Sequence, residues 1–484
     1  MTSGNTCGHE GWFAAHSIKS YLFPFLVLCS SAVSILSHEV LWMILPFVVL
    51  FIWASIQRVH WIYFIMLASI PFSTEIDLPG GLGTDFPDEV LMWWLCAIGG
   101  LYLLTHVSGI KNLVRHPVTW LLLIHWVWIF ICCLGSRDIF HSMKYWLSKS
   151  WYLFVFYILA YTFFKNEKRI SAFVWVSALA ACATILVIEV RHSFTGFAFS
   201  AINSVVLPFY RNHVNYACLQ VCLLPYVWAL WHYSRDKKLI RNIVVLLAIG
   251  MLLGIVLSYT RAAYVALFSI AFFYPLVRVK GVTIFTVGIL LAVCTGLFYL
   301  QQHNHFLEYA PDYNKAISHT DFSSLLSATT KGKDISTMER LYRWVAGARM
   351  VGEKYIIGFG PGEFYNNYKP YTLTQFTTYV SNNPDRSTIH NYFLMTAVEQ
   401  GIPGVLIFFA ILIAYLKQAE QSLFSLSGNY KRWAVASLWS MGSILVILMF
   451  NDMIETDKVG SYFFINLAIL VKVIDLDRFK KTLN

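Results

Sequence analysis

Charged residues are scarce in this chain: they make up 13% of its 484 residues, against about 25% in ordinary soluble domains. Hydrophobic residues make up 57% and aromatic residues 17%, and the mean hydropathy is +0.59. So few charges exclude an ordinary water-soluble globular protein. The composition predicts a membrane protein.

Motifs for metal or redox chemistry are missing as well. The nine cysteines contain no Cys-x-x-Cys pair, and none follows Cys294. His303 and His305 form a lone His-x-His pair, which supplies too few ligands for a metal. We therefore expect no bound metal and no cofactor.

Long hydrophobic runs dominate the sequence. A run of about 18 residues fits one helical crossing of a ~30 Å hydrocarbon core, and helices satisfy their own backbone groups in lipid. The sequence thus predicts an all-α polytopic membrane protein with about 12–14 transmembrane helices, since two of the candidates are short or weak (20–37 and 60–74). The candidates are 20–37, 39–57, 60–74, 89–107, 117–135, 147–164, 170–190, 214–233, 240–259, 262–279, 282–301, 391–416, 432–451 and 459–476.

The connections between these runs alternate between a basic set and a set that includes two acidic turns. Basic connections remain in the cytoplasm, so the basic set and both chain termini are expected there. The net charge of +10 then reflects topology and contact with anionic membrane lipid, and it requires no nucleic-acid partner. The basic set holds Arg58; Lys111 and Arg115; Lys165, Lys168 and Arg169; Arg235, Lys237, Lys238 and Arg241; Arg278 and Lys280; Lys431 and Arg432. The acidic turns hold Glu75, Asp77, Asp85, Asp88 and Glu89, and Asp452, Glu455 and Asp457.

One long polar stretch, 302–389, interrupts the hydrophobic pattern. It divides the chain into N-terminal transmembrane helices (1–301), a periplasmic and partly helical insert (302–389), and C-terminal transmembrane helices with a cytoplasmic tail (390–484). Within the insert, Ser336-Thr-Met-Glu339 has the capping-box pattern and predicts the start of an amphipathic helix.

Glycine and proline mark two further features of this part of the chain. Gly358-Phe-Gly-Pro-Gly362 predicts a tight turn after the amphipathic helix. Gly401-Ile-Pro-Gly404 lies inside the next hydrophobic run and predicts a kink in that helix, with neighbouring groups satisfying the freed backbone atoms.

Four polar residues lie at or near the predicted outer membrane edge: Arg211, Arg261, Arg340 and His390. Arginine at this edge opposes the positive-inside bias, and guanidinium groups suit phosphate oxygens. A neutral histidine can take a proton from a sugar hydroxyl near pH 7.

Each of these residues also has a purely structural interpretation. Arg261 fits an interfacial arginine whose charged head reaches water. Arg211 fits a helix start capped by asparagine, and Arg340 fits the solvated face of an amphipathic helix. His390 fits a hydrogen-bonded residue at the start of a helix.

Three sequence pieces in this order resemble the bacterial O-antigen ligase and O-antigen polymerase superfamily. They are Ser258-Tyr-Thr-Arg-Ala262; Arg340-x-x-x-Trp344 followed by the Gly358–Gly362 turn; and His390-Asn-Tyr-Phe-Leu394, which runs on to Gly401–Gly404. The resemblance extends from Leu257 to about Ile413. Thr260 replaces the serine that usually precedes the arginine.

The resemblance implies an enzyme that transfers a polysaccharide from undecaprenyl pyrophosphate in the inner membrane, without a metal and with inversion at the anomeric carbon. Arg261 and Arg340 are then expected to stabilise the pyrophosphate leaving group and His390 to activate the acceptor hydroxyl. Further substrate-binding candidates are Arg211, Asn215, Arg343 and Asn391.

The acceptor stays open among three enzymes that share this donor. An O-antigen ligase uses a sugar of the lipid A core, and its motif series is the closest. An O-antigen polymerase uses another lipid-linked repeat, and a protein O-oligosaccharyltransferase uses a serine or threonine. A different class, a transporter or flippase of lipid-linked sugars, would also have many helices, but such proteins usually bind their cargo near the bilayer midplane.

Overall fold

The protein is a bundle of hydrophobic helices. The computed structural model describes residues 10–78, 82–310, 335–377, 381–383 and 387–483. In this part of the chain, eleven helices are long and apolar enough to cross a membrane. Two shorter apolar helices, Phe23–Ser37 and Val59–Phe72, accompany them. The prediction of an all-α polytopic membrane protein is confirmed.

The N-terminal helices end in a small β-hairpin that the sequence analysis did not anticipate. Strands β1 (Thr74–Leu78) and β2 (Leu82–Phe86) pair antiparallel, with Thr74 opposite Phe86. The hairpin carries the first acidic turn, and it shortens the predicted segment 60–74 to a helix that ends at Ser69. The preceding elements are α1 (Glu10–Ser37), η1 (Val40–Ile44), α2 (Leu45–Gln57), α3 (Val59–Ser69) and η2 (Ile70–Phe72).

The middle of the chain forms most of the bundle. Predicted segment 147–164 is part of one longer helical run that begins at Ile139 and includes a π-helical stretch, η4. The elements are α4 (Asp88–Thr105), η3 (Val107–Ile110), α5 (Lys111–Arg115), α6 (Pro117–Leu134), α7 (Ile139–Tyr152), η4 (Leu153–Leu159), α8 (Ala160–Phe163), α9 (Glu167–Ser193), η5 (Phe199–Ala201), α10 (Ile202–Val205), α11 (His213–Tyr233), α12 (Lys238–Leu257), α13 (Arg261–Arg278) and α14 (Val282–Gln301).

The insert and the C-terminal helices complete the structure. The predicted amphipathic helix is present as α16, whereas the side chain of Ser336 in the predicted capping box lies outside the described part. The elements are η6 (Gln302–Tyr309), α16 (Ile335–Glu353), α17 (Phe364–Asn367), η8 (Lys369–Tyr371), η9 (Thr374–Phe376), α18 (Tyr392–Ser425), α19 (Gly428–Phe450), η10 (Met453–Glu455) and α20 (Asp457–Leu483).

Side-chain caps start several of the long helices. Asn166 accepts a hydrogen bond from the N–H of Arg169 at the start of α9, and Asn391 accepts one from Leu394 at the start of α18, both at 3.0 Å. Asn212 caps α11 in the same way. These side chains satisfy backbone N–H groups that have no partner inside the helix.

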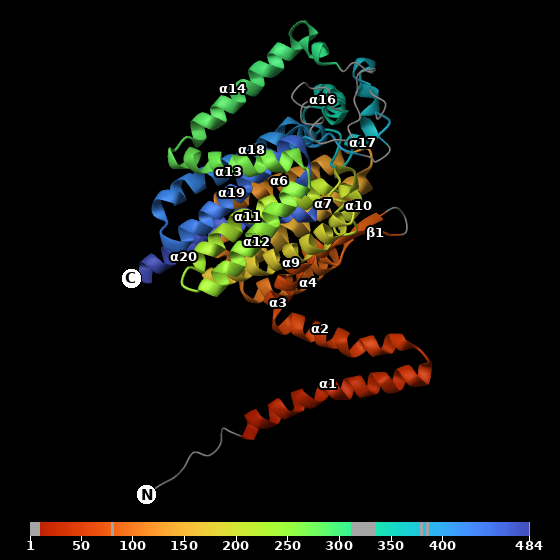
Figure 1. The fold of residues 1–484 in the computed structure, drawn as a ribbon, viewed down its shortest axis with the longest axis vertical. Coiled ribbons are helices and arrows are strands. Elements are labelled where there is room, and N and C mark those ends of the chain that lie inside the picture. Colours follow the sequence, from red (N-terminus) through yellow and green to blue (C-terminus); the bar gives the residue numbers. More distant parts are fainter. Residues whose placement is uncertain (1–9, 79–81, 311–334, 378–380, 384–386, 484) are drawn as a thin grey trace.

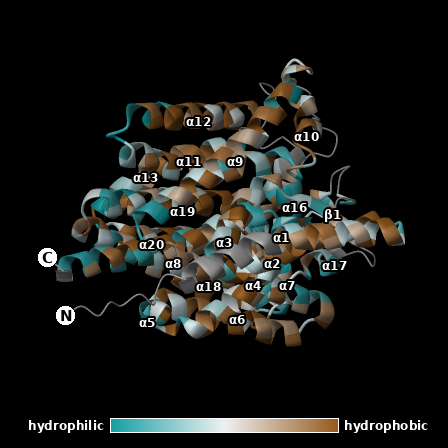
Figure 2. Cartoon of the chain, turned by 90° about the horizontal axis from the view of Figure 1, so that it is seen from below, coloured by the Kyte–Doolittle hydropathy of each residue, from teal (hydrophilic) through white to brown (hydrophobic). Residues whose placement is uncertain are grey.

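Three helices occupy the centre of the bundle. In α11, α19 and α20, between 72% and 78% of the residues in the most apolar stretch are buried inside the protein. The buried share is only 6% in α14 and 11% in η1–α2. Figure 1 shows α14 on one side of the bundle and α1 and α2 extending away on the other. Hydrophobic residues are exposed on helices at the surface of the bundle, such as α12 (Figure 2), as expected of surfaces in contact with lipid.

The two sets of connections lie at opposite ends of the bundle. We call one end the basic end: it holds the basic connections defined above, and there Asn429 donates to Glu167 at 2.9 Å across two of them. We call the other end the acidic end: it holds the β-hairpin, the insert and the turn from Asn451 to Thr456. This separation is the one that alternating membrane crossings produce.

Candidate functional site

His390 lies at the acidic end, immediately before the start of α18. Its φ of +55° turns the backbone sharply between the insert and the helix. The next residue, Asn391, caps the helix and donates from its side-chain amide to the carbonyl of Met449 at 3.2 Å. This second contact attaches the start of α18 to the end of α19.

Two arginines of α16 surround the imidazole of His390 with positive charge. Burial, together with the charges of Arg343 and Arg340, lowers the pKa of His390 from its ordinary 6.5 to about 3. Its Nδ1 atom is buried and has no hydrogen-bond partner in the described part of the chain. The structure thus places a neutral imidazole beside two cations, which is a suitable environment for an anionic group.

Helix α16 also fixes the backbone that leads to His390. Arg343 donates to the carbonyl of Thr388 at 3.0 Å and to the carboxylate of Glu339 at 3.2 Å. Trp344 donates from Nε1 to the carbonyl of Ile389 at 3.0 Å. Arg343 is therefore bound within the protein, and these contacts position the segment before His390.

The predicted glycine turn packs into the predicted kink of α18. Gly401 has φ +70° and ψ −178°, so the helix is broken there. Pro403 has no N–H to donate to Glu399, and Gly360 donates to that carbonyl instead, at 3.0 Å. Phe359 donates to the carbonyl of Val398 at 2.9 Å. The insert thus satisfies the backbone groups that the break exposes, as the sequence predicted.

The same turn contacts the connection between α6 and α7. Ser142 donates to the carbonyl of Pro361 at 2.8 Å. A Cβ at Gly360 would collide with Ser136, and one at Gly362 would lie 2.9 Å from the imidazole of His141. Glycine is therefore required for the turn to enter this narrow space, and the turn joins α18 to α6 and α7 behind His390.

A second group of the predicted residues lies where α11 and α13 begin. Arg261 is the first residue of α13, and the preceding Thr260 donates to the carbonyl of His213 at 3.2 Å. Arg211 is exposed, with Nε 4.0 Å from the carboxylate of Glu75 on the hairpin. Asn215 is buried, and its Oδ1 atom has no hydrogen-bond partner in the described part.

Asp452 lies between the two groups. Burial raises the pKa of its carboxyl, while the nearby hydroxyl of Thr388 and the charge of Arg211 oppose that rise. Thr388 is two residues from His390, whereas Arg211 belongs to the start of α11. The structure therefore forms two groups of the predicted residues. The first holds His390, Arg340, Arg343 and Asn391, and the second holds Arg211, Asn215 and Arg261. Asp452 lies between these two groups.

Acidic residues of this network were not among the site residues expected from the sequence. Glu455 forms an ion pair with Lys149 at 2.8 Å and accepts a hydrogen bond from Tyr145 at 2.7 Å. Asp457 accepts a hydrogen bond from Ser73 at 3.2 Å. In the sequence, Glu455 and Asp457 served only as topology signals. Lys149 could have indicated these residues, because a charged residue inside an apolar segment usually has a buried partner of opposite charge.

One comparison with known proteins bears on this site. A family model described as O-antigen ligase matches residues 243–409, a range that includes Arg261, α16, the glycine turn, His390 and the break in α18. No curated protein matches the chain. Over these residues, the match supports the resemblance to the O-antigen ligase/polymerase superfamily that the sequence motifs predicted.

Proposed function

We propose that the protein is an O-antigen ligase of the bacterial inner membrane. It would move a polysaccharide from undecaprenyl pyrophosphate to a sugar hydroxyl of the lipid A core, with the insert in the periplasm and both termini in the cytoplasm. The observation that carries the proposal is the cluster of His390, Arg340 and Arg343 at the start of α18, inside the region that matches the family.

In this proposal, arginines of the acidic end bind the pyrophosphate of the donor. Arg261 and Arg340 are the principal ligands, with Arg211 and the buried amide of Asn215 beside them. Guanidinium groups form paired hydrogen bonds with phosphate oxygens. As the bond from sugar to phosphate breaks, negative charge grows on the leaving group, and fixed cations favour that transition state.

His390 activates the acceptor. The hydroxyl oxygen of the acceptor sugar attacks the anomeric carbon of the donor as the bond from that carbon to the pyrophosphate oxygen breaks. The hydroxyl proton passes to the imidazole of His390, and undecaprenyl pyrophosphate leaves with the bonding electrons. Attack opposite the leaving group inverts the anomeric configuration. No metal ion takes part in this scheme.

Donor binding would also adjust His390 for this role. A pKa of about 3 makes the unliganded imidazole a weak base. The pyrophosphate brings negative charge, which offsets the charges of Arg343 and Arg340 and therefore raises the pKa of His390. The base then becomes effective only when the donor is in place.

Arg343 and Asn391 would contribute to this site by positioning. Arg343 donates to Glu339 and Thr388, and Asn391 caps α18 and contacts Met449. These contacts hold the backbone on both sides of His390. We therefore propose that both residues serve substrate binding through the placement of His390.

A polymerase or a protein O-oligosaccharyltransferase would use the same donor and the same residues, so only the acceptor separates these enzymes from a ligase. A transporter has less support. The proposed ligands lie at the helix ends beside the insert, whereas transporters usually place them near the bilayer midplane.

A lipopolysaccharide gel tests the proposal. A deletion strain would be complemented with the wild type, with His390→Ala, or with His303→Ala as a control histidine from the same insert. We expect the strain with His390→Ala to lose the capped ladder, which is the series of lipopolysaccharide bands that carry polysaccharide. It should accumulate lipid-linked polymer and contain wild-type amounts of the protein in the membrane. His303→Ala should restore the ladder.

Three other results would contradict this assignment. Caps reduced to a single repeat would identify a polymerase. An unchanged ladder with His390→Ala would exclude His390 as the catalytic base. If the wild type fails to restore the ladder although lipid-linked polymer accumulates, the acceptor is not the lipid A core.

A further inference from the structure

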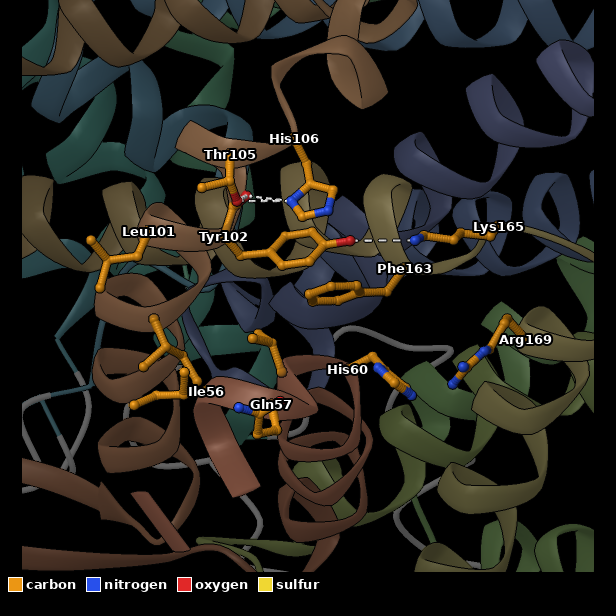
Figure 3. A pocket seen from close by; sticks show the side chains of 12 residues that line it. Ile56, Gln57, His60, Leu101, Tyr102, Thr105, His106, Phe163, Lys165 and Arg169 are labelled. Atoms are coloured by element: carbon orange, nitrogen blue, oxygen red, sulfur yellow. Dashed lines mark hydrogen bonds between the residues drawn. The ribbon is translucent and has the colours of Figure 1, made fainter. Parts of the chain in front are cut away.

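A cavity lies at the basic end, opposite the candidate active site. Its volume is about 530 Å³, and it is enclosed by the C-terminal ends of α2, α4 and α8 and by the first turns of α3 and α9 (Figure 3). Helix α4 runs from the acidic end to this cavity, and with 18 residues it is about 27 Å long. The cavity is thus separate from the proposed ligase site.

One side of the cavity is cationic. Figure 3 shows Lys165 and Arg169 on this side, with His60 next to Arg169. Arg58 lies between α2 and α3, and the charges of Arg169, Arg58 and Lys165 all reach the imidazole of His60. Within the described residues, no carboxylate forms an ion pair with any of these three cations. Lys165 has a single side-chain hydrogen bond, to the hydroxyl of Tyr102 at 3.3 Å.

The opposite side of the cavity is apolar and faces outward. Ile56 and Leu101 line it, and their side chains are 63% and 66% exposed on the surface of the bundle. Between the two sides, Tyr102 stacks on His106 with ring centroids 4.1 Å apart and forms part of the wall. A small soluble anion needs only the cations. A lipid also uses an apolar wall that opens toward the surrounding membrane.

We propose that this cavity binds an anionic glycerophospholipid. The phosphate would lie between Lys165 and Arg169, near Arg58, and an acyl chain would follow Ile56 and Leu101 out into the bilayer. Basic pockets between transmembrane helices on the cytoplasmic side are known to hold such headgroups. A lipid in this position would touch both α2 and α9 and would connect the N-terminal helices to the bundle.

Lipid binding to the purified full-length protein tests the proposal. The delipidated protein would be titrated with cardiolipin or phosphatidylethanolamine, and the bound lipid would be counted by native mass spectrometry. We expect cardiolipin to be retained in preference to phosphatidylethanolamine. Lys165→Gln/Arg169→Gln should weaken cardiolipin binding on the order of tenfold, because each cation near a membrane surface contributes to the attraction. Lys237→Gln/Lys238→Gln removes the same charge at the same end, outside the cavity, and should leave binding unchanged.

A second variant distinguishes lipid binding in the cavity from attraction of lipid to general surface charge. Leu101→Trp keeps every cation and fills the apolar side, so it should also reduce cardiolipin binding. Equal losses in the two double variants, or no loss with Leu101→Trp, would overturn the proposal.

Inorganic pyrophosphate serves as the soluble competitor. If it stabilises the wild type against heat through Lys165 and Arg169 while cardiolipin does not bind, the ligand is a soluble phosphate compound and the lipid proposal is wrong. Because none of these readouts uses glycan transfer, the outcome is independent of the proposed ligase activity.

Discussion

Gly360 donates its backbone N–H to the carbonyl of Glu399 at 3.0 Å, where Pro403 has left that carbonyl without its helical partner. Ile402 in turn donates to the carbonyl of Tyr355 at 2.7 Å. A turn of the polar insert and a broken membrane helix thus complete each other's hydrogen bonds. Because α18 begins two residues after His390, this junction determines where His390 lies relative to the bundle.

Gly401→Ala should disrupt this junction. Its φ of +70° and ψ of −178° belong to a region that only glycine adopts readily, and a Cβ would collide with the carbonyl of Ile356. We expect a loss of stability on the order of 2–3 kcal/mol and loss of transfer activity. Thermal unfolding of the purified protein measures the first effect. Gly352→Ala in α16 has open space at its Cβ and should be neutral or slightly stabilising, so equal unfolding temperatures in the two variants would contradict the interpretation.

Arg343→Met should destabilise the protein more than the loss of a surface arginine. Arg343 and Glu339 form a buried ion pair with side chains 6% and 9% exposed, and removal of one partner leaves the other charge uncompensated. Such a change costs about 3–5 kcal/mol. Arg349→Met, on the same helix and exposed, should cost less than about 1 kcal/mol. Denaturation of both variants in the same detergent makes the comparison, and similar losses would show that the pair contributes little.

The pH dependence of transfer should differ between free and donor-bound enzyme. The pKa of His390 is about 3 in the unliganded protein, so kcat/KM should not fall through protonation of His390 until about pH 4. In the donor complex the pKa is raised, and kcat should therefore begin to fall at a higher pH than kcat/KM. Rates between pH 4 and 8 on purified protein measure the fall of kcat and show whether kcat/KM stays level over this range. If kcat and kcat/KM both fell with the same pKa near 6.5, the arginines would not act on His390.

Asp85→Asn should stabilise the protein at alkaline pH. Burial, followed by the negative charge of Asp457, raises the pKa of Asp85 from 3.8 to about 7. The folded state therefore binds the proton more tightly than the unfolded state. Ionisation of Asp85 therefore lowers the free energy of unfolding. This loss is fully present above pH 7 and diminishes as the pH falls toward 3.8. With allowance for partial exposure, we expect a gain of about 1–2 kcal/mol at pH 8 and a smaller gain at pH 5.

Unfolding curves at the two pH values test this expectation for Asp85. Asp236→Asn is the matched control, because Asp236 is exposed at the basic end, and it should change stability at neither pH. A gain that is larger at pH 5 than at pH 8 would reverse the predicted sign and would refute the role given to burial.

The sequence by itself determined most of the helices. Each of the fourteen predicted segments contains a helix, although strand β1 cuts short the one in 60–74; 282–301 is reproduced as α14, and 214–233 differs from α11 by one residue. Such segments can be predicted because the length of an apolar run and the charge beside it are local properties that decide membrane insertion directly. The predicted segment 391–416 continues to Ser425, beyond its hydrophobic part.

The tertiary structure alone decided which polar residues meet. Arg340 and Arg343 look equivalent in the sequence, yet Arg343 is paired with Glu339 while the charges of both act on His390. Asp452 is a turn residue in the sequence and a partly buried neighbour of Thr388 and Arg211 in the fold. Apart from the Arg343–Glu339 pair, which lies within one helix, these relationships join residues tens to hundreds of positions apart. They depend on how the helices pack and on the entry of the glycine turn into the break of α18, and neither follows from local composition.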